Sequence, residues 1–366
     1  MAGSGFGTNF RITTWGETHG AGVGVVVDGC PAGLLLERED VQKYLDRRKP
    51  GQSKYTTQRK EGDQVEILSG IFEGRTTGTP ISMVVYNKDQ RSKDYSNIKD
   101  IYRPGHADFT FDMKYGFRDY RGGGRSSGRE TIGRVAAGAV AAKVLKELGI
   151  EIKAYAKAIA GIEVSKEHFD FAEMNNNPFN MPDKEAAKLV QEKADQMIKE
   201  MDSIGGIIEC QITGMPVGIG ETVFDKLDAE LSKAIMSIGS VKGFEIGDGF
   251  EAANLRGSEN NDDFICVDGK VEKETNHSGG VLGGMSDGSA IVFRAAIKPT
   301  PSIAQTQKTV NRDLDNVEIE IHGRHDPMIV PRAVVVVESM AAVTILDGVL
   351  KNLGATMDNI KKIYGE

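Results

Sequence analysis

Residues 122–145 have the sequence GGGRSSGRETIGRVAAGAVAAKVL, in which a glycine-rich loop runs directly into an apolar segment. From Ile132 onward the apolar residues recur at helical spacing, and Gly149 marks the predicted end of this helix. Ser127 and Glu130 have the spacing of a capping box at its start. A glycine loop at a helix N-terminus offers free N–H groups and a favourable dipole to an anion.

Arginines lie on both sides of this loop, although the formal net charge of the chain is −8. Their guanidinium groups can clamp phosphate or carboxylate in a bidentate manner, so we predict a site for a small anion here. The overall acidity argues against general nucleic-acid binding. The alternative is solvated arginines in weak pairs with nearby acidic residues. The six arginines are Arg103, Arg118, Arg121, Arg125, Arg129 and Arg134.

The composition indicates a soluble cytoplasmic protein. The 366 residues include only three cysteines, Cys30, Cys210 and Cys266, which do not suggest a disulfide framework. The N-terminus lacks a basic region followed by an apolar run, and no apolar run approaches about 20 residues, so neither a signal peptide nor a membrane span is expected. The 44 glycines exceed the usual share of about 7% and predict many close backbone approaches.

Single strands and separate helical blocks predict one α+β domain over residues 1–366, because no break in composition resembles a linker. Residues 29–33 and 214–218 are both Gly-x-Pro-x-Gly turns followed by helical segments, which favours an internal duplication. Residues 52–63 are expected to form a mobile polar loop, and residues 250–276 an exposed segment. Strands are expected at 10–14, 23–27, 65–72, 81–86, 151–162, 207–213, 291–297 and 317–321, and helices at 39–48, 132–145, 183–201, 227–238 and 334–353.

Two of the six histidines are candidates for acid–base chemistry. His19 and His106 each lie in a glycine-flanked polar turn, where a ligand can approach. His168 is expected on the surface. His322 and His325 have the spacing of two metal ligands, but no cysteine or carboxylate spacing completes a zinc site, so no metal is expected. The residues alone therefore favour an enzyme for a small phosphorylated or polycarboxylate substrate.

Two other classes of protein compete with this interpretation. Residues 123–128 have the glycine spacing of a phosphate-binding NTPase loop, but Arg129-Glu130 replaces the required Lys-Ser/Thr pair. An NTPase would show magnesium-dependent nucleotide binding there. An RNA-binding protein would show steep salt dependence and aromatic stacking beside the arginines. Aromatic residues in that region are Tyr115, Phe117 and Tyr120.

Several distinctive motifs are spread across almost the whole chain. They are Trp15-Gly16-Glu17-Thr18-His19-Gly20, Asp46-Arg47-Arg48, Arg103-Pro104-Gly105-His106-Ala107-Asp108, residues 122–130, Asn276-His277-Ser278-Gly279-Gly280, Lys298-Pro299-Thr300 and Gly323-Arg324-His325-Asp326-Pro327. In their residues and their order they resemble the chorismate synthase family. Two departures are Thr18, where many members have serine, and Lys54, where some have arginine.

This resemblance implies a lyase of the shikimate pathway, which supplies aromatic amino acid biosynthesis. The family converts 5-enolpyruvylshikimate 3-phosphate to chorismate by an anti 1,4-elimination, in which phosphate leaves C3 and a hydrogen leaves C6. The reaction has no net redox change, yet it requires reduced FMN. The implied fold is a β-α-β sandwich with helices packed between antiparallel sheets. The implied assembly is a homotetramer, with no nucleic-acid or membrane partner.

The resemblance also assigns roles to individual residues. His19 would protonate the departing phosphate, His106 would supply a proton near flavin N1, and Asp326 would assist proton removal through flavin N5. The implied substrate-binding residues are Arg48, Arg103, Arg129, Arg134 and Arg332. The implied FMN-binding residues are Arg125, Ser126, Ser127, Gly239, Ser240, Gly283, Lys298, Pro299, Thr300, Pro301, Ser302 and Arg324.

The source of the reduced flavin stays open at this point. Some family members reduce their own flavin with NADPH, usually in longer chains, so the compact length here favours a separate flavin reductase. However, Arg48 and Lys54 lie where contacts to the nicotinamide nucleotide are assigned in the family, which keeps NADPH as an alternative.

Overall fold

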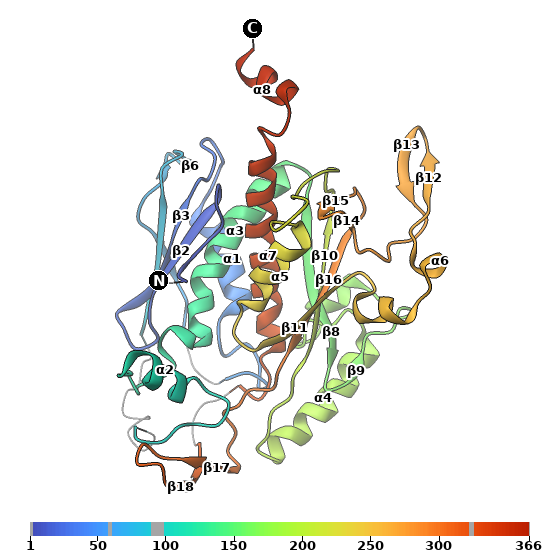
Figure 1. Cartoon of the computed structure of the whole chain (residues 1–366). Helices are drawn as coiled ribbons and strands as arrows, with labels where there is room; N and C mark the ends of the chain where they lie inside the picture. Colours follow the sequence, from blue (N-terminus) through green and yellow to red (C-terminus); the bar gives the residue numbers. More distant parts are fainter. Residues whose placement is uncertain (1–2, 58–60, 89–98, 322–325, 366) are drawn as a thin grey trace.

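Two five-stranded sheets enclose a layer of helices in the computed structural model, which describes residues 3–57, 61–88, 99–321 and 326–365 (Figure 1). The strand pairs within both sheets are antiparallel, so the predicted α+β class and β-α-β sandwich are confirmed. The first sheet has the order β1 (Gly5–Phe6), β2 (Arg11–Gly16), β3 (Gly22–Asp28), β7 (Ile81–Tyr86), β4 (Val65–Ile67). The second has the order β11 (Val241–Ile246), β16 (Ile291–Ile297), β10 (Gly206–Thr213), β8 (Glu151–Ile159), β9 (Ile162–Glu163).

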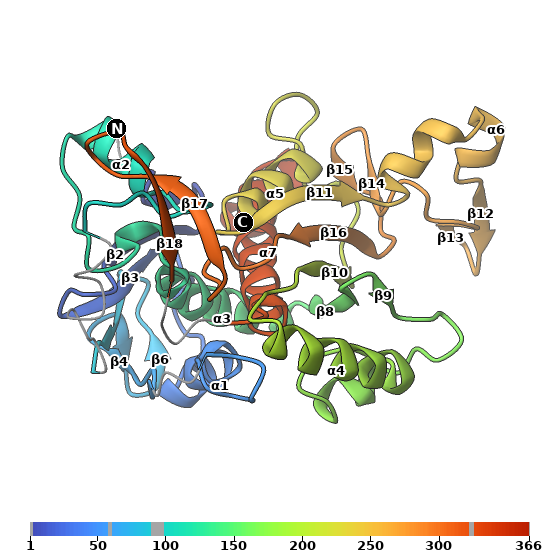
Figure 2. The ribbon, with the colours of Figure 1, turned by 90° about the horizontal axis from the view of Figure 1, so that it is seen from below.

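Four helices fill the space between the sheets. The central pair is α3 (Thr131–Glu147), which packs on β2 and β3, and α7 (Val330–Asn352), which packs on β8 and β10. Beside them lie α1 (Arg38–Arg48) and α5 (Leu227–Met236) (Figure 1). Helices at the periphery are α2 (Asp108–Tyr115), α4 (Lys184–Lys199), α6 (Gly257–Asn260) and α8 (Met357–Tyr364), of which α8 is seen in Figure 1 and α2, α4 and α6 in Figure 2.

Small two-stranded hairpins among the described residues are β5 (Ile71–Phe72) with β6 (Arg75–Thr76), β12 (Phe264–Val267) with β13 (Lys270–Lys273), β14 (Val281–Leu282) with β15 (Met285–Ser286), and β17 (Thr306–Val310) with β18 (Asn316–Glu320). The hairpin β12–β13 and α6 project from the body (Figure 2), so the expected exposed segment contains short elements of its own.

The two halves of the chain repeat one arrangement. In the first sheet the order β2-β3-β7-β4 matches β8-β10-β16-β11 in the second, and each set is followed along the chain by one of the central helices. Thr76 Oγ1 donates to Pro31 O at 2.6 Å in the first Gly-x-Pro-x-Gly turn, and Ser286 Oγ donates to Pro216 O at 2.6 Å in the second. These shared contacts support the predicted duplication.

α7 is apolar on nearly all sides because it is the core helix. Its most apolar 18-residue window has a mean hydropathy of 2.0, long and apolar enough for a membrane span, but 83% of that window is buried inside the protein. The sequence analysis predicted a helix here but did not expect an apolar run of this length, because polar residues interrupt it. One of them, Glu338, accepts two hydrogen bonds of 2.8 Å from Arg47.

Three sequence predictions need correction. Ser127 caps the short 3-10 turn Gly128–Glu130 by accepting from Arg129 N, and α3 starts only at Thr131, so the predicted capping box is wrong. The carboxylate of Glu130 instead accepts from Thr14 and Arg134. Several residues of the predicted mobile loop are buried: Tyr55, Thr56, Thr57 and Asp63. The sequence analysis also did not predict several elements, namely α2, α6, α8, β1, β6, β11, β12, β13, β14, β15 and β17.

The two central helices approach so closely that a side chain on Gly138 has no room. A Cβ there would lie 2.2 Å from Ser339 Cβ and 2.5 Å from Ser339 Cα. We therefore expect Gly138→Ala to lower the free energy of unfolding by about 1–3 kcal/mol, although alanine is intrinsically better than glycine in a helix by roughly 0.5–1 kcal/mol. Urea denaturation measures this change. The control is Gly257→Ala, where a Cβ meets no atom within 4 Å; a stabilised Gly138→Ala would contradict the close contact.

Candidate active site

A buried carboxylate holds two of the predicted substrate arginines. Asp63 Oδ2 lies 3.0 Å from Arg48 Nη2, and its Oδ1 lies 3.0 Å from Arg129 Nη1. The side chain of Asp63 is 0% exposed, and that of Arg48 only 1%. Arg129 also donates to Asn87 through Nε and lies 3.7 Å from Glu61. Both guanidinium groups are therefore fixed in position, because each has a charged partner in a water-poor environment.

Arg48 connects this pair to the start of α3. Its Nη1 donates to Gly128 O at 3.2 Å and to Thr131 Oγ1 at 3.3 Å, while its buried Nε has no hydrogen-bond partner among the described residues. Burial, opposed by Asp63, lowers the pKa of Arg48 to about 10. The group is still charged at neutral pH, so a buried cation with an unsatisfied donor is available to an anion.

The start of α7 contributes a second ion pair. Arg332 Nη1 lies 2.8 Å from Asp326 Oδ2, and Asp326 Oδ1 accepts from Thr57 N at 2.7 Å. Arg332 and Asp326 are both close enough to affect the pKa of Arg48. The N-termini of the two central helices therefore meet at one arginine cluster, which we define as Arg48, Arg129 and Arg332.

The glycine-rich loop itself uses its N–H groups internally. Ser126 N donates to Gly123 O, Ser127 N to Gly124 O, and Glu130 N to Ser127 O, in two 3-10 turns, Gly124–Ser126 and Gly128–Glu130. The expectation of a loop with free N–H groups is thus wrong for these positions. The same turns leave no phosphate-binding loop of the NTPase kind, which counts against that alternative.

His106 lies in a second polar cluster. Its Nδ1 is 2.9 Å from Pro104 O, and its Nε2 is 2.8 Å from Ser302 Oγ. A carbonyl oxygen can only accept, so the proton of the neutral ring is on Nδ1, and Nε2 accepts from the Ser302 hydroxyl. Burial and the nearby charge of Arg103 lower the pKa of His106 below its usual value of 6.5.

Residues 298–302 fit closely around the His106 loop. Gly105 has a φ of +69°, and a Cβ on it would lie 2.6 Å from Pro301 Cβ, so only glycine fits there. Lys298 Nζ donates to Gly105 O at 3.1 Å, and Lys298 N donates to Ser240 O at 2.9 Å. The hydroxyl of Thr300 is buried without a hydrogen-bond partner among the described residues.

A third cluster surrounds β2. Arg125 donates to Thr14 Oγ1 at 2.7 Å, and Arg134 pairs with Glu130 at 2.8 Å. Arg134 also donates to Ser237 Oγ at 2.6 Å. This contact connects α3 to the segment before Gly239 and Ser240.

His19 lies in the loop after β2, against the glycine-rich loop. A Cβ on Gly122 would lie 2.9 Å from His19 Cδ2, so the triple glycine leaves room for this imidazole. The neighbouring Thr18 is 6% exposed, and its hydroxyl has no hydrogen-bond partner in the described part of the chain. Hydrogen bonding to Arg121 holds the pKa of Asp119 below its usual value, and His19 lies close enough to make a smaller electrostatic contribution.

Ion pairs between the arginines and nearby acidic residues, which the alternative interpretation of the arginine-rich stretch expected, are also present. Asp108 binds Arg103 in a bidentate manner at 2.7 and 2.8 Å and lies 2.9 Å from Arg118. These three side chains are less than a tenth exposed, so the pairs are buried rather than solvated. Arg121 pairs with Asp119 at 2.6 Å on the surface, as that interpretation expected.

Other predicted residues lie apart from these clusters. Gly283 is in the β14–β15 turn at the opposite end of β16 from Lys298, and Lys54 pairs with Asp195 of α4 at 2.8 Å. Arg324, His322 and His325 are outside the described residues. Within the described residues no group of three His, Cys, Asp or Glu side chains could hold a metal ion.

The sequence analysis missed Asp63 as the acidic partner of Arg48 and Arg129. Asp63 carries no local signal, because it lies in a polar segment and its burial depends on α1 and α3 packing around it. Asp108, the last residue of the His106 motif, was among the nearby acidic residues expected to pair with the arginines, although its burial was not expected. Ser302 was predicted as a flavin contact, and its hydrogen bond to His106 was not foreseen.

Buried arginines at two helix N-termini, with histidines in nearby loops, define an α+β enzyme for a small polyanionic substrate. The chain belongs to the chorismate synthase family, whose sequence model matches residues 10–350. Members of this family are phosphate-eliminating lyases of the shikimate pathway that depend on FMN.

Individual relatives and a solved structure agree with this membership. The chain is 67% identical over 364 residues to a chorismate synthase of Lachnospira eligens, covering 100% of both chains. It is 56% identical over 355 residues to one of Methanococcoides burtonii, covering 96% of this chain and 97% of that one. A chorismate synthase crystal structure matches with a TM-score of 0.77 at 31% identity, covering 98% of this chain and 96% of the other.

Removing the charge of Asp63 leaves Arg48 and Arg129 buried without a counterion. We expect Asp63→Asn to lower the free energy of unfolding by about 3–5 kcal/mol, measured by urea denaturation. The matched control is Asp195→Asn, which removes an ion pair with Lys54 on the surface and should cause no measurable change. Equal midpoints for the two variants would show that Asp63 does not stabilise the cluster.

The lowered pKa of His106 predicts a neutral ring at pH 7 and a titration midpoint below 6.5. The unfolded chain then binds more protons than the folded one below about pH 6.5, so the contribution of His106 to stability is full above that pH and is lost as the pH falls. Imidazole NMR resonances followed against pH measure the midpoint, with His106→Gln for assignment. A midpoint at or above 6.5 would mean that the ring is not shielded from water.

Proposed function

We propose that the arginine cluster binds the phosphate and carboxylates of 5-enolpyruvylshikimate 3-phosphate for the elimination that this family catalyses. The observation that carries the proposal is the convergence of Arg48, Arg129 and Arg332 at the N-termini of α3 and α7. Helix dipoles and guanidinium groups both favour anions there. Arg103 and Arg134 would add positive charge at the edge of the site.

The histidines would move protons in this reaction. His19, beside the glycine-rich loop, would act as the general acid that protonates the departing phosphate. His106 holds its Nδ1 proton on Pro104 O, so a proton carried to the reaction centre would be bound at Nε2 and released readily, because the pKa is low. Asp326, held by Arg332 and Thr57, would assist removal of the C6 hydrogen.

The polar groups around His106 fit a flavin mononucleotide. Lys298 offers an ammonium group, and the buried hydroxyl of Thr300 lacks a partner among the described residues. Ser240 joins them through Lys298, and Arg125, Ser126 and Ser127 lie on the glycine-rich loop. Reduced FMN would supply electron density to the substrate, while these residues would bind and orient it. Gly283 and Arg324 remain predicted contacts to FMN.

We further propose a cytoplasmic homotetramer whose flavin is reduced by a separate reductase. The compact length of 366 residues supports the choice of a separate reductase, because members that reduce their own flavin are usually longer. NADPH is the alternative reductant, and Lys54, exposed and paired with Asp195, would then have to exchange partners to bind it.

The test is an anaerobic assay of the protein with photoreduced FMN and 5-enolpyruvylshikimate 3-phosphate, in which phosphate and chorismate are measured together. We expect equal amounts of both products, formed only with reduced flavin. His19→Ala and His106→Ala should lose at least about 100-fold in turnover, the usual contribution of general acid–base catalysis, while keeping their fold and substrate binding.

The controls separate the parts of this proposal. His168→Ala changes an exposed histidine and should keep full turnover. Oxidised FMN with NADPH should give no product if the reductase is separate. Product formation by both histidine variants at the normal rate would refute their roles, and unfolding of either variant would indicate a structural role instead.

A further inference from the structure

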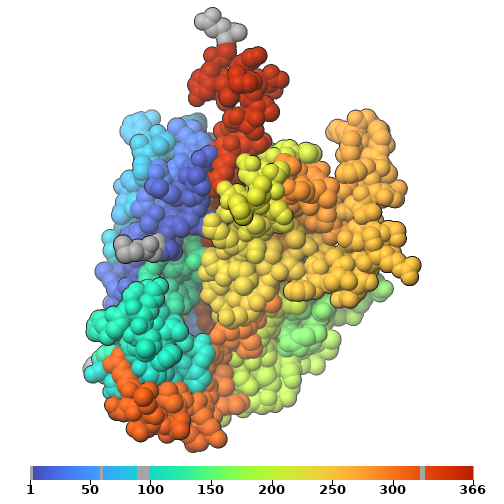
Figure 3. All heavy atoms as spheres, in the orientation of Figure 1, coloured from blue at the N-terminus to red at the C-terminus, as the bar shows by residue number. Residues whose placement is uncertain are grey.

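No other helix or strand in the described part of the chain packs extensively on the C-terminal helix α8. Its eight residues, Met357–Tyr364, contain no buried side chain, and the helix stands clear of the body (Figures 1 and 3). Residues of the helix itself stabilise both of its ends. At the N-terminus Thr356 Oγ1 accepts a hydrogen bond from Asn359 N at 3.2 Å, and at the C-terminus Lys361 and Lys362 in the last turn interact favourably with the helix dipole. A helix this short is marginal in water without tertiary packing.

One face of α8 is apolar and exposed. The side chains of Met357, Ile360, Ile363 and Tyr364 recur at helical spacing and are 63%, 37%, 57% and 83% exposed. An amphipathic helix normally buries such a stripe, and this one meets solvent along its whole length. The apolar face is therefore built for a surface that the single chain does not provide.

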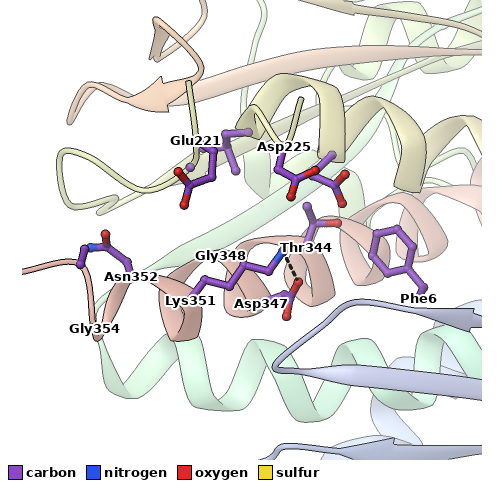
Figure 4. Close-up of a pocket in the computed structure, with 13 residues that line it drawn as sticks. Phe6, Glu221, Asp225, Thr344, Asp347, Gly348, Lys351, Asn352 and Gly354 are labelled. Atoms are coloured by element: carbon purple, nitrogen blue, oxygen red, sulfur yellow. Dashed lines mark ion pairs between the residues drawn. The ribbon is translucent and has the colours of Figure 1, made fainter. Parts of the chain in front are cut away.

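A cavity of about 240 Å³ lies at the same end of the molecule, between the end of α7, the start of α5 and β1 (Figure 4). The carboxylates of Glu221 and Asp225 point across it towards α7, and Phe6 closes one side. Lys351 is already paired with Asp347 at 3.1 Å. Arg332 precedes Asp347 by 15 residues of α7, or roughly 22 Å at 1.5 Å per residue, so the cavity is remote from the active site.

The rim of this cavity complements α8 in two ways. The loop before α5 exposes Val223 by 64% and Phe224 by 89%, next to the acidic Glu221 and Asp225. α8 presents an apolar stripe next to two lysines. Apolar surface can thus meet apolar surface while opposite charges face each other.

We propose that α8 docks on this cavity in a second copy of the chain, and that the two copies exchange their helices reciprocally. Gly354 and Ala355 line the cavity of their own chain, but α8 leads away from it into solvent (Figures 1 and 4). The helix and the cavity lie at the same end of the molecule. A two-fold axis at that end would therefore place the α8 of each copy on the cavity of the other copy. The family match covers residues 10–350, so Phe6 and α8 lie outside it.

The first test is a disulfide between chains. In a Cys266→Ser background, which removes the exposed cysteine, one tagged chain carries Ile360→Cys and a co-expressed chain with another tag carries Val223→Cys. We expect a covalent heterodimer on oxidation. Absence of the heterodimer overturns the proposal, and so does a cross-link that forms only within a chain carrying both cysteines, which would place α8 on its own cavity.

The second test is the mass in solution, measured by sedimentation velocity. Deletion of residues 356–366 and the pair Lys361→Glu, Lys362→Glu should both weaken association at least about tenfold, and adding Glu221→Lys with Asp225→Lys should restore the paired variant. The control is Lys184→Glu with Lys188→Glu, the same charge change on exposed positions of α4. Unchanged association after the deletion refutes the exchange. Lyase activity is not the readout, so the outcome is independent of the proposed chemistry.

Discussion

The structure depends on the close contact between α3 and α7. Gly138 and Ser339 bring the two backbones together, so that each helix can cover its own sheet and still touch the other. Because the two halves repeat one arrangement of strands, the two helices are equivalent, and their equivalent ends lie at the same place. The duplication thus produces a single site at the junction of two similar units.

Placing two parallel helix N-termini and three arginines together concentrates positive charge where water is scarce. Asp63 and Asp326 offset part of this charge, and each also fixes the direction of the guanidinium groups that it binds. The remaining positive potential is what a phosphate and two carboxylates would neutralise. In the proposed function this cluster is organised before the substrate arrives, which lowers the entropic cost of binding.

Sequence patterns predicted most of the sandwich and fewer of the site contacts. The strands at 81–86 and 291–297 were predicted to the residue, because their apolar runs end at turns rich in polar residues and glycine. The start of α3 was wrong, since Ser127 satisfies a 3-10 turn instead of the helix. Asp63 could not be predicted, because a carboxylate becomes a buried counterion only when distant segments enclose it. The family motifs supplied the histidine roles that spacing alone left open.

The position of α7 in the chain has a consequence for synthesis of the protein. This helix is the most apolar segment and lies near the C-terminus, so it leaves the ribosome after both sheets and α3 have been made. Until then the inner face of the second sheet lacks the central helix that packs on β8 and β10, whereas α3 can already cover β2 and β3 of the first sheet. The core between the sheets can therefore be completed only near the end of translation, when this one long hydrophobic helix becomes available.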